Sequence, residues 1–182
     1  MKFILLCFLT FITLYSYSQN QIFPNIEGNT LEDKPIEFPA DAKGKVTLIA
    51  IAYSKKSDDY LKDWLVPVYR NFINPPQSSF IPIMPYDVNI FFIALLKGIA
   101  KTAKGKIESN LNKNLDPEYY SHTVISKSEF KPIRDALRFG KKDLPYFFVV
   151  DPQGAIVYQT EGAYSNSKMQ EIVDQVDKHS KR

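Results

Sequence analysis

The residues from Val46 to Tyr53, VTLIAIAY, form a continuous apolar run that is rich in β-branched side chains. A run of this length without a polar interruption is typical of a central strand that is buried on both faces of a sheet. Strands of this kind occur in α/β domains, where helices cover both faces of the sheet. The chain has 182 residues, which suits a single domain of this class with a substantial core.

A helix is predicted directly after this strand. Apolar residues from Tyr60 to Phe72 recur at helical spacing, and Asp58 and Asp59 suit the positive end of the helix dipole. The polar turn between the strand and the helix runs from Ser54 to Ser57. Turns at the carboxyl ends of strands in α/β sheets often lie at binding sites.

The last part of the chain predicts a hairpin and a closing helix. The segment LPYFFVVDPQGAIVYQTEGAY has two apolar strands around a turn at residues 151–154, with Pro at its second position and Gly at its fourth. A helix should follow, capped by Ser165 or Asn166. Other expected elements are an edge strand with Ile36 and Phe38, a strand in SHTVIS, and a short helix that ends at Gly140.

The middle of the chain is harder to classify. A short strand is expected in SFIPIMPY, residues 79–86, and an amphipathic helix from Leu95 to Leu111. We therefore expect a helical insertion around residues 86–118. Lys97, Lys101 and Lys104 share one face of this helix, which is either a solvated face or a contact with an anionic membrane surface.

The first residues predict export. A lone Lys2, an apolar run from Phe3 to Leu14 and small residues up to Ser18 are typical of a signal peptide over residues 1–18, with the folded domain at 19–182. The protein would then be periplasmic or secreted. An uncleaved anchor is the alternative, although the apolar run is short for a membrane span. Cys7 is the only cysteine, so the exported chain would have no thiol for catalysis or metal binding.

Charge and motifs favour no particular enzyme class. The net charge of +3 gives no reason to expect a nucleic acid partner. We see no metal-ligand cluster, phosphate loop or dinucleotide motif, and therefore expect no metal and no cofactor. His122 and His179 suit structural or solvated positions. A serine–lysine pair within residues 54–57 is disfavoured, because adjacent lysines on an exposed turn stay charged and are poor bases.

Three segments together resemble the thioredoxin-like superfamily: GKVTLIAIAYS, DLPYFFVVDPQGAIVYQTEG and the closing helix. The arm FPNIEGNTLEDKPIEFPADAKGK resembles the lead-in of the peroxiredoxin and exported thioredoxin-like branches. The resemblance implies a mixed central sheet flanked by helices. A looser similarity, carried by FP near the start, GKVTLIAIAY and Trp64, is to the cysteine-lacking, thioredoxin-like assembly factors of the mitochondrial ATP synthase, which implies an assembly or chaperone role.

The resemblance also implies where a site would lie. The two cysteines of the superfamily's redox motif should fall at the turn from Ser54 to Asp59, where this sequence has none. The resemblance assigns to Pro145 the role of a cis-proline that faces this turn across a shallow groove, with an ordinary trans proline as the alternative. Leu144 would offer backbone hydrogen bonds to an extended peptide. Tyr53, Trp64 and Tyr146 are candidate apolar neighbours or core residues.

We therefore expect a protein that is not an enzyme. The predicted function is a protein-binding, chaperone or assembly module of the cell envelope. A redox-pathway accessory without thiol chemistry and a non-thiol enzyme are the alternatives. The expected partner is a protein or an extended peptide, and the oligomeric state does not follow from the sequence. The predicted groove consists of Ser54, Lys55, Lys56, Ser57, Leu144 and Pro145.

Overall fold

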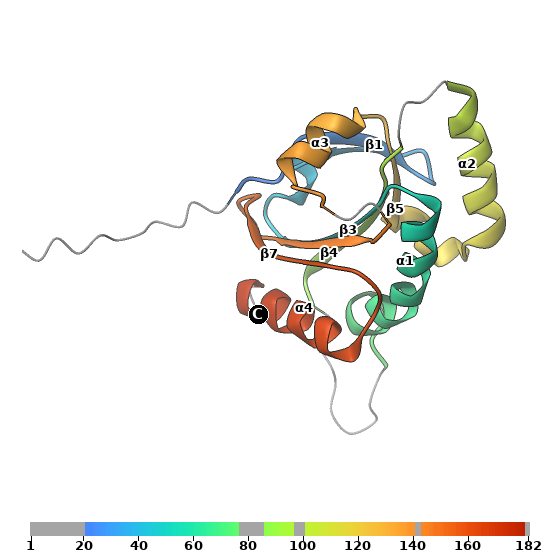
Figure 1. Cartoon of the computed structure of the whole chain (residues 1–182). Helices are drawn as coiled ribbons and strands as arrows, with labels where there is room; N and C mark the ends of the chain where they lie inside the picture. The colour runs from blue at the N-terminus through green and yellow to red at the C-terminus, as the bar shows by residue number, and fades with distance from the viewer. Residues whose placement is uncertain (1–20, 77–85, 97–100, 141–142, 181–182) are drawn as a thin grey trace, which may run out of the picture.

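The computed structural model describes residues 21–76, 86–96, 101–140 and 143–180, with the side chains of the second helix described from residue 105 onward (Figure 1). One mixed sheet has the strand order β2-β1-β5-β4-β3-β6-β7. The strands are β1 (Ile26–Thr30), β2 (Pro35–Phe38), β3 (Val46–Ala52), β4 (Val88–Ala94), β5 (Thr123–Ser126), β6 (Tyr146–Val150) and β7 (Ile156–Glu161). The helices are α1 (Lys55–Val68), α2 (Lys101–Asn114), α3 (Phe130–Ala136) and α4 (Asn166–His179), with shorter turns η1 (Ala40–Ala42), η2 (Tyr69–Ile73) and η3 (Pro117–His122).

Strand β3 is an inner strand of the sheet, between β4 and β6, as its apolar sequence predicts. All seven of its residues are buried. It pairs in parallel with β4, where Ala52 lies opposite Ala94, and antiparallel with β6. Since β4 also pairs in parallel with β5, three neighbouring strands end at the same edge of the sheet. The loops that follow them are therefore brought together there.

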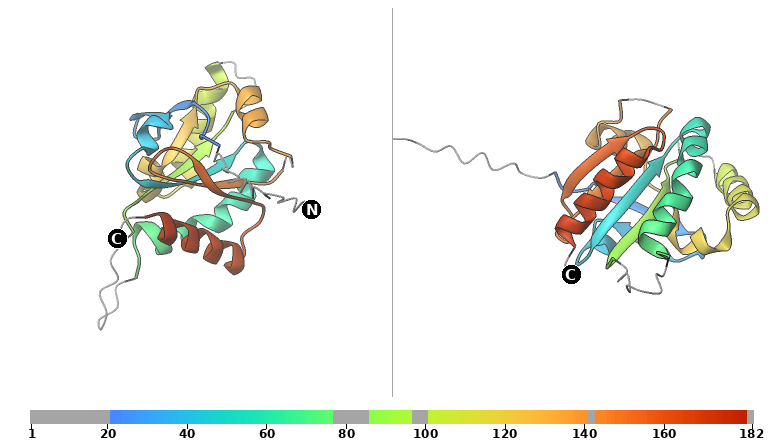
Figure 2. Two further views of the ribbon diagram at one scale, coloured as in Figure 1. Left: turned by 90° about the vertical axis from the view of Figure 1, so that its left-hand side faces the viewer. Right: turned by 90° about the horizontal axis from the view of Figure 1, so that it is seen from below.

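Two apolar layers cover the sheet, so the predicted α/β class with a mixed, helix-covered sheet is confirmed. On one face α1 and α4 pack against the strands, and Trp64 lies 4.1 Å from Phe147 between ring centroids. On the other face α3 and the N-terminal arm enclose a second core that contains Phe148 and Ile133. Figure 2 shows the sheet between these layers.

The expected helical insertion around residues 86–118 is wrong in its first part. Residues 88–94 form β4, and only residues 101–114 form the helix α2. The sequence VNIFFIA is apolar on both sides because β4 is an inner strand of the sheet, and such a run has no period that separates strand from helix. The strand expected at residues 79–86 falls almost entirely outside the described residues.

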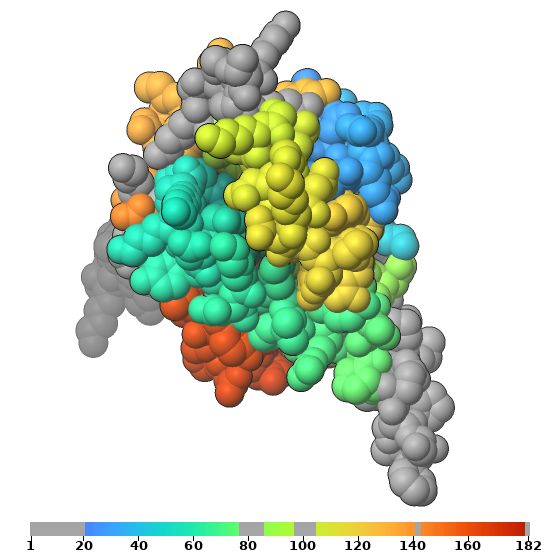
Figure 3. Space-filling view, turned by 90° about the vertical axis from the view of Figure 1, so that its right-hand side faces the viewer, coloured from blue at the N-terminus to red at the C-terminus, as the bar shows by residue number. Residues whose placement is uncertain are grey.

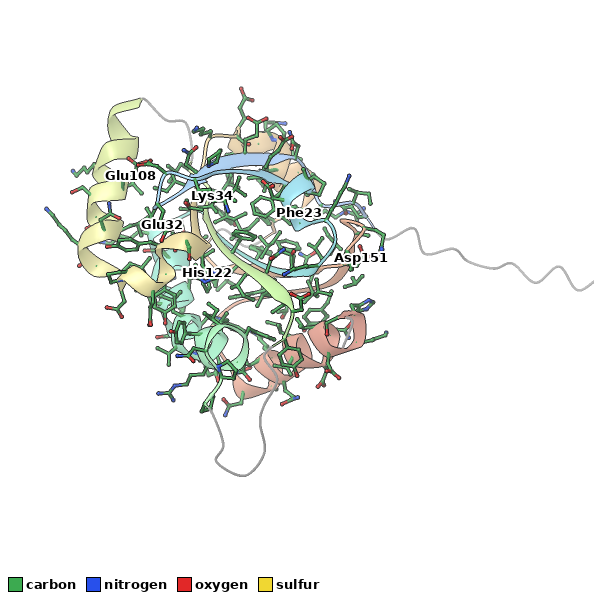
Figure 4. The ribbon with its side chains drawn as sticks, turned by 180° about the vertical axis from the view of Figure 1, so that it is seen from behind. Phe23, Glu32, Lys34, Glu108, His122 and Asp151 are labelled. Atoms are coloured by element: carbon green, nitrogen blue, oxygen red, sulfur yellow. The ribbon has the colours of Figure 1, made fainter. Side chains whose placement is uncertain are left out.

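The C-terminal hairpin forms where its turn residues predict it. Asp151 Oδ1 accepts hydrogen bonds from the backbone N–H groups of Gln153 and Ala155, both at 2.9 Å. Gly154 has a φ of 90°, in the region that favours glycine. Figure 4 shows Asp151 at this end of the molecule, near the N-terminal arm. The closing helix α4 is capped by Ser165, which accepts a hydrogen bond from the N–H of Lys168.

The N-terminal arm belongs to the folded domain through Phe23. Its backbone N–H donates to the carbonyl of Gly154 at 2.8 Å, and its side chain is 1% exposed. The ring makes edge-to-face contacts with Phe38 and Phe148, at centroid distances of 6.0 and 5.7 Å. The preceding Ile22 pairs with Ala155 through the backbone, but its side chain is 56% exposed.

We expect Phe23→Ala to destabilise the protein by about 3–5 kcal/mol, because it empties a closed aromatic site in the core. Ile22→Ala is the matched control: it removes an exposed side chain next door and should change stability by less than about 0.5 kcal/mol. Urea unfolding, followed by tryptophan fluorescence, gives both values. Equal effects of the two substitutions would show that the arm is not anchored by Phe23.

Candidate functional site

The turn between β3 and α1 is built around two serine hydroxyls. Ser57 Oγ accepts hydrogen bonds from the N–H groups of Tyr53 at 3.0 Å and Ser54 at 2.9 Å, and donates to the Ser54 carbonyl at 2.8 Å. Ser54 Oγ in turn accepts from the Ser57 N–H at 3.1 Å. This reciprocal pairing is a capping box, which supplies partners to the first backbone groups of the helix. Both hydroxyls are therefore committed to holding the helix start.

The six predicted groove residues have different environments. Lys55 and Lys56 are exposed in the first turn of α1, whereas the Ser57 side chain is completely buried. Ser54 Oγ lies 3.4 Å from Asp143 Oδ1. The structure thus brings the turn beside the segment that leads into β6, where Leu144 is half-buried and Pro145 is buried. No observation tests whether these residues bind a partner, so the groove stays a prediction.

The predicted cis bond between Leu144 and Pro145 is wrong. In the described part of the chain the cis peptide bond joins Phe38 to Pro39. Pro145 precedes β6, a position where an ordinary trans proline is tolerated because no ladder hydrogen bond is needed from its nitrogen. Its carbonyl accepts a hydrogen bond from the N–H of Gly162, which closes the base of the β6–β7 hairpin.

A cavity of about 630 Å³ lies on the other side of the same turn, at the carboxyl ends of β3 and β4. Helix α2 forms its outer wall, and Figure 3 shows the face of the molecule where α2 lies alongside α1. The cavity residues contributed by the strand ends are Ala52, Tyr53, Ala94, Leu95 and Leu96; those from α1 and its cap are Ser54, Lys55 and Asp58; those from α2 are Lys106, Ile107, Ser109, Asn110, Leu111 and Lys113.

The cavity wall has a basic excess. Three of its side chains are the lysines Lys55, Lys106 and Lys113, against the carboxylate of Asp58. Burial raises the pKa of Asp58 above its ordinary value, although Lys62, whose Nζ lies 3.9 Å away, acts in the opposite direction. Its side chain retains 46% of its exposure, so this carboxylate is only partly shielded from water.

The aromatic residues near the turn are core residues. Tyr53 stacks on Phe139 with ring centroids 5.2 Å apart and contacts Phe130 at the same distance. Burial, with a further contribution from Tyr146, raises the pKa of Tyr53 to about 12, so its hydroxyl stays protonated at neutral pH. Trp64, also a candidate groove neighbour, is fully buried and donates its indole N–H to the Gly162 carbonyl at 3.1 Å.

The sequence analysis did not predict this cavity, although one signal for it is present on α2. The side chains of Ile107 and Leu111 lie one helical turn apart, and this apolar spacing is a usable signal of an inward face. This spacing does not show which strand ends the inward face of α2 packs against, because that depends on how the chain crosses from β4 to β5.

The remaining candidate residues are His122 and the lysines of the α2 region. His122 Nδ1 lies 3.0 Å from the Ile90 carbonyl, on η3 beside β4 (Figure 4), as expected for a structural histidine. Lys97 lies outside the described residues, as do the side chains of Lys101 and Lys104, so the predicted membrane-surface contact has no structural test. In the described ranges no helix is long and apolar enough to cross a bilayer, and no three metal-ligating side chains gather.

We expect Ser57→Ala to destabilise the protein by about 1–3 kcal/mol, because it leaves the buried N–H of Tyr53 and the partly buried N–H of Ser54 without their acceptor. Ser121→Ala, at an exposed position on η3, is the matched control and should change stability by less than about 0.5 kcal/mol. Denaturant unfolding of both variants gives the comparison. A neutral Ser57→Ala would mean that the cap does not hold the turn.

Comparison with solved structures agrees with the fold. A thiol:disulfide interchange protein from a Bacteroides species is 17% identical with a TM-score of 0.57, covering 87% of this chain and 90% of that chain. BsSco, a member of the Sco family of cytochrome c oxidase assembly proteins, is 12% identical with a TM-score of 0.57, covering 88% and 94%. Yeast Sco1 with copper bound is 14% identical with a TM-score of 0.54, covering 86% and 93%. At these identities the similarity shows the thioredoxin-like fold alone.

No curated protein is similar enough to the chain to match it. One family model matches almost the whole chain, over residues 7–178, and it describes the ATP10 protein. With one cysteine in 182 residues, the chain lacks the two-cysteine motif that the superfamily resemblance led us to look for. The fold and the family support an assembly or redox-accessory role in general terms. The chain is a thioredoxin-like protein that belongs to the ATP10 family.

Proposed function

We propose that this chain is a non-catalytic binding module that acts in the assembly of other proteins. The observation that carries the proposal is the state of the β3–α1 turn. At the position that the superfamily resemblance assigns to a reactive cysteine pair, Ser54 and Ser57 are engaged in capping α1. A serine hydroxyl cannot exchange disulfides, and these two are further engaged in backbone hydrogen bonds.

The cavity beside this turn supplies the binding surface in this proposal. Ligands of open α/β sheets bind in the crevice outside the carboxyl ends of the strands, which is where β3 and β4 end. The volume of about 630 Å³ is within the range of ligand-binding pockets. The predicted groove at Leu144 and Pro145 is a neighbouring surface across the turn, and both surfaces could contact one partner.

The place of action in the proposal is the cell envelope. It is supported by the sequence of residues 1–18, which has the pattern of a cleaved signal peptide. We expect the mature protein to begin at Gln19 and to be released by osmotic shock. N-terminal sequencing of protein purified from the cell envelope measures this directly. A mature chain that retains Met1 in the cytoplasm would contradict the predicted export.

The binding role is tested by cross-linking in living cells. A photoreactive side chain replaces Leu111 in the cavity wall or, as the control, the exposed Val66 on α1, which is 50% exposed and outside the cavity. We expect a discrete cross-linked protein from position 111 and none from position 66. Mass spectrometry should identify it as a subunit of a larger complex, whose assembled form should decline when the gene for this chain is deleted.

Two outcomes would replace the proposal by its alternatives. Disulfide reductase activity in the purified mature chain, above the rate measured without the protein, would contradict the non-catalytic role. Cross-linking that depends on the thiol state of the partner would identify a redox accessory instead, because an assembly module should bind its partner in either thiol state.

A further inference from the structure

Three apolar side chains of the cavity wall are not part of either core. Leu96, Ile107 and Leu111 are half-buried, and none of them joins the two apolar clusters that hold the described part of the fold together. They face the same cavity from two directions, with Leu96 after β4 and the other two on α2. Apolar side chains that line an open cavity remain in contact with water, and an apolar ligand that enters the cavity is stabilised by removing this surface from water.

The charges around this surface indicate what the occupant carries. Lys55, Lys106 and Lys113 are exposed on the wall, and within the described residues none of them forms an ion pair. The carboxylate of Asp58 is already opposed by Lys62. The unpaired charge is therefore positive, and it favours an occupant with carboxylates on either side of its apolar part.

We infer that the cavity receives a segment of a partner protein in which a cluster of apolar side chains is flanked by acidic residues. The inference rests on the proposed function and names the chemistry of its partner. The polar side chains of Ser109 and Asn110 on α2 also line the cavity, and they suit the peptide groups and side chains of a protein segment better than an acyl chain. An amphipathic helix with an acidic polar face meets this description.

Two synthetic amphipathic peptides test the inference directly. They share one leucine face, and their flanking positions are glutamate in one peptide and lysine in the other. Fluorescence anisotropy with the purified chain at low salt gives both affinities. We expect the glutamate peptide to bind at least about tenfold more tightly, with a preference that falls as salt is added.

Variants of the chain separate the two contributions. The double substitution Lys106→Glu and Lys113→Glu should lower the affinity for the glutamate peptide by about tenfold or more, so that this peptide no longer binds more tightly than the lysine peptide. Leu111→Ser should lower the affinity for both peptides by a similar factor, because it removes an apolar contact with the leucine face that the two peptides share. Lys178→Glu, at an exposed position on α4 away from the cavity, reverses one lysine charge outside the site and should leave both affinities unaltered. Circular dichroism confirms that each variant is folded.

Several results would overturn the inference. They are equal binding of the two peptides, tighter binding of the lysine peptide, or an unchanged preference in the double lysine variant. Binding to phosphatidylglycerol vesicles without binding to either peptide would assign the cavity to a lipid surface. If position 111 still cross-links a partner in cells, any of these results rejects only the acidic partner chemistry. If it does not, the proposed function itself is rejected.

Discussion

Burial of β3 on both faces is the constraint on which the rest of the molecule depends. Because none of the residues from Val46 to Ala52 reaches solvent, both faces of the sheet must be covered, by α1 and α4 on one side and by α3 with the N-terminal arm on the other. After Ala52 the chain leaves the sheet, and α1 begins only three residues later. The first backbone N–H groups of α1 therefore need hydrogen-bond acceptors within this short turn. The cap formed by Ser54 and Ser57 meets that need without help from a ligand.

The same cap explains how the turn between β3 and α1 is held in place although it has no pair of cysteines. In a redox motif the side chains at this point are available to a substrate. Here the Ser57 hydroxyl is inside the protein and joined to three backbone groups. The side chains that do reach the surface, Lys55 and Lys56, bring charge and no nucleophile at neutral pH. The state of these side chains supports the proposed binding role at this edge of the sheet.

The sequence predicts those features whose signals are local. The apolar run of β3, the turn at residues 151–154 and the Ser165 cap all depend on residues within a few positions, and all three are confirmed. Strand β4 was misassigned because an inner strand with no polar side has no period. The cis bond expected at Pro145 came from a resemblance, and the local backbone does not adopt it. The cavity was missed because it exists only where α2 meets the ends of two strands.

The cavity follows from the way the chain connects its parallel strands. A crossover from β4 to β5 needs a long connection, and here it contains α2 and η3. Tyr119 of η3 joins the core under α1 and so anchors the end of this connection. Helix α2 has a largely polar surface, and its half-buried Ile107 and Leu111 belong to neither core. Helix α2 is anchored after its C-terminal end and carries lysines toward the cavity. It therefore forms a wall of the cavity, and its side chains do not fill the space between the helix and the strand ends. The fold thus places a cavity at the edge of the sheet where we propose that a partner binds.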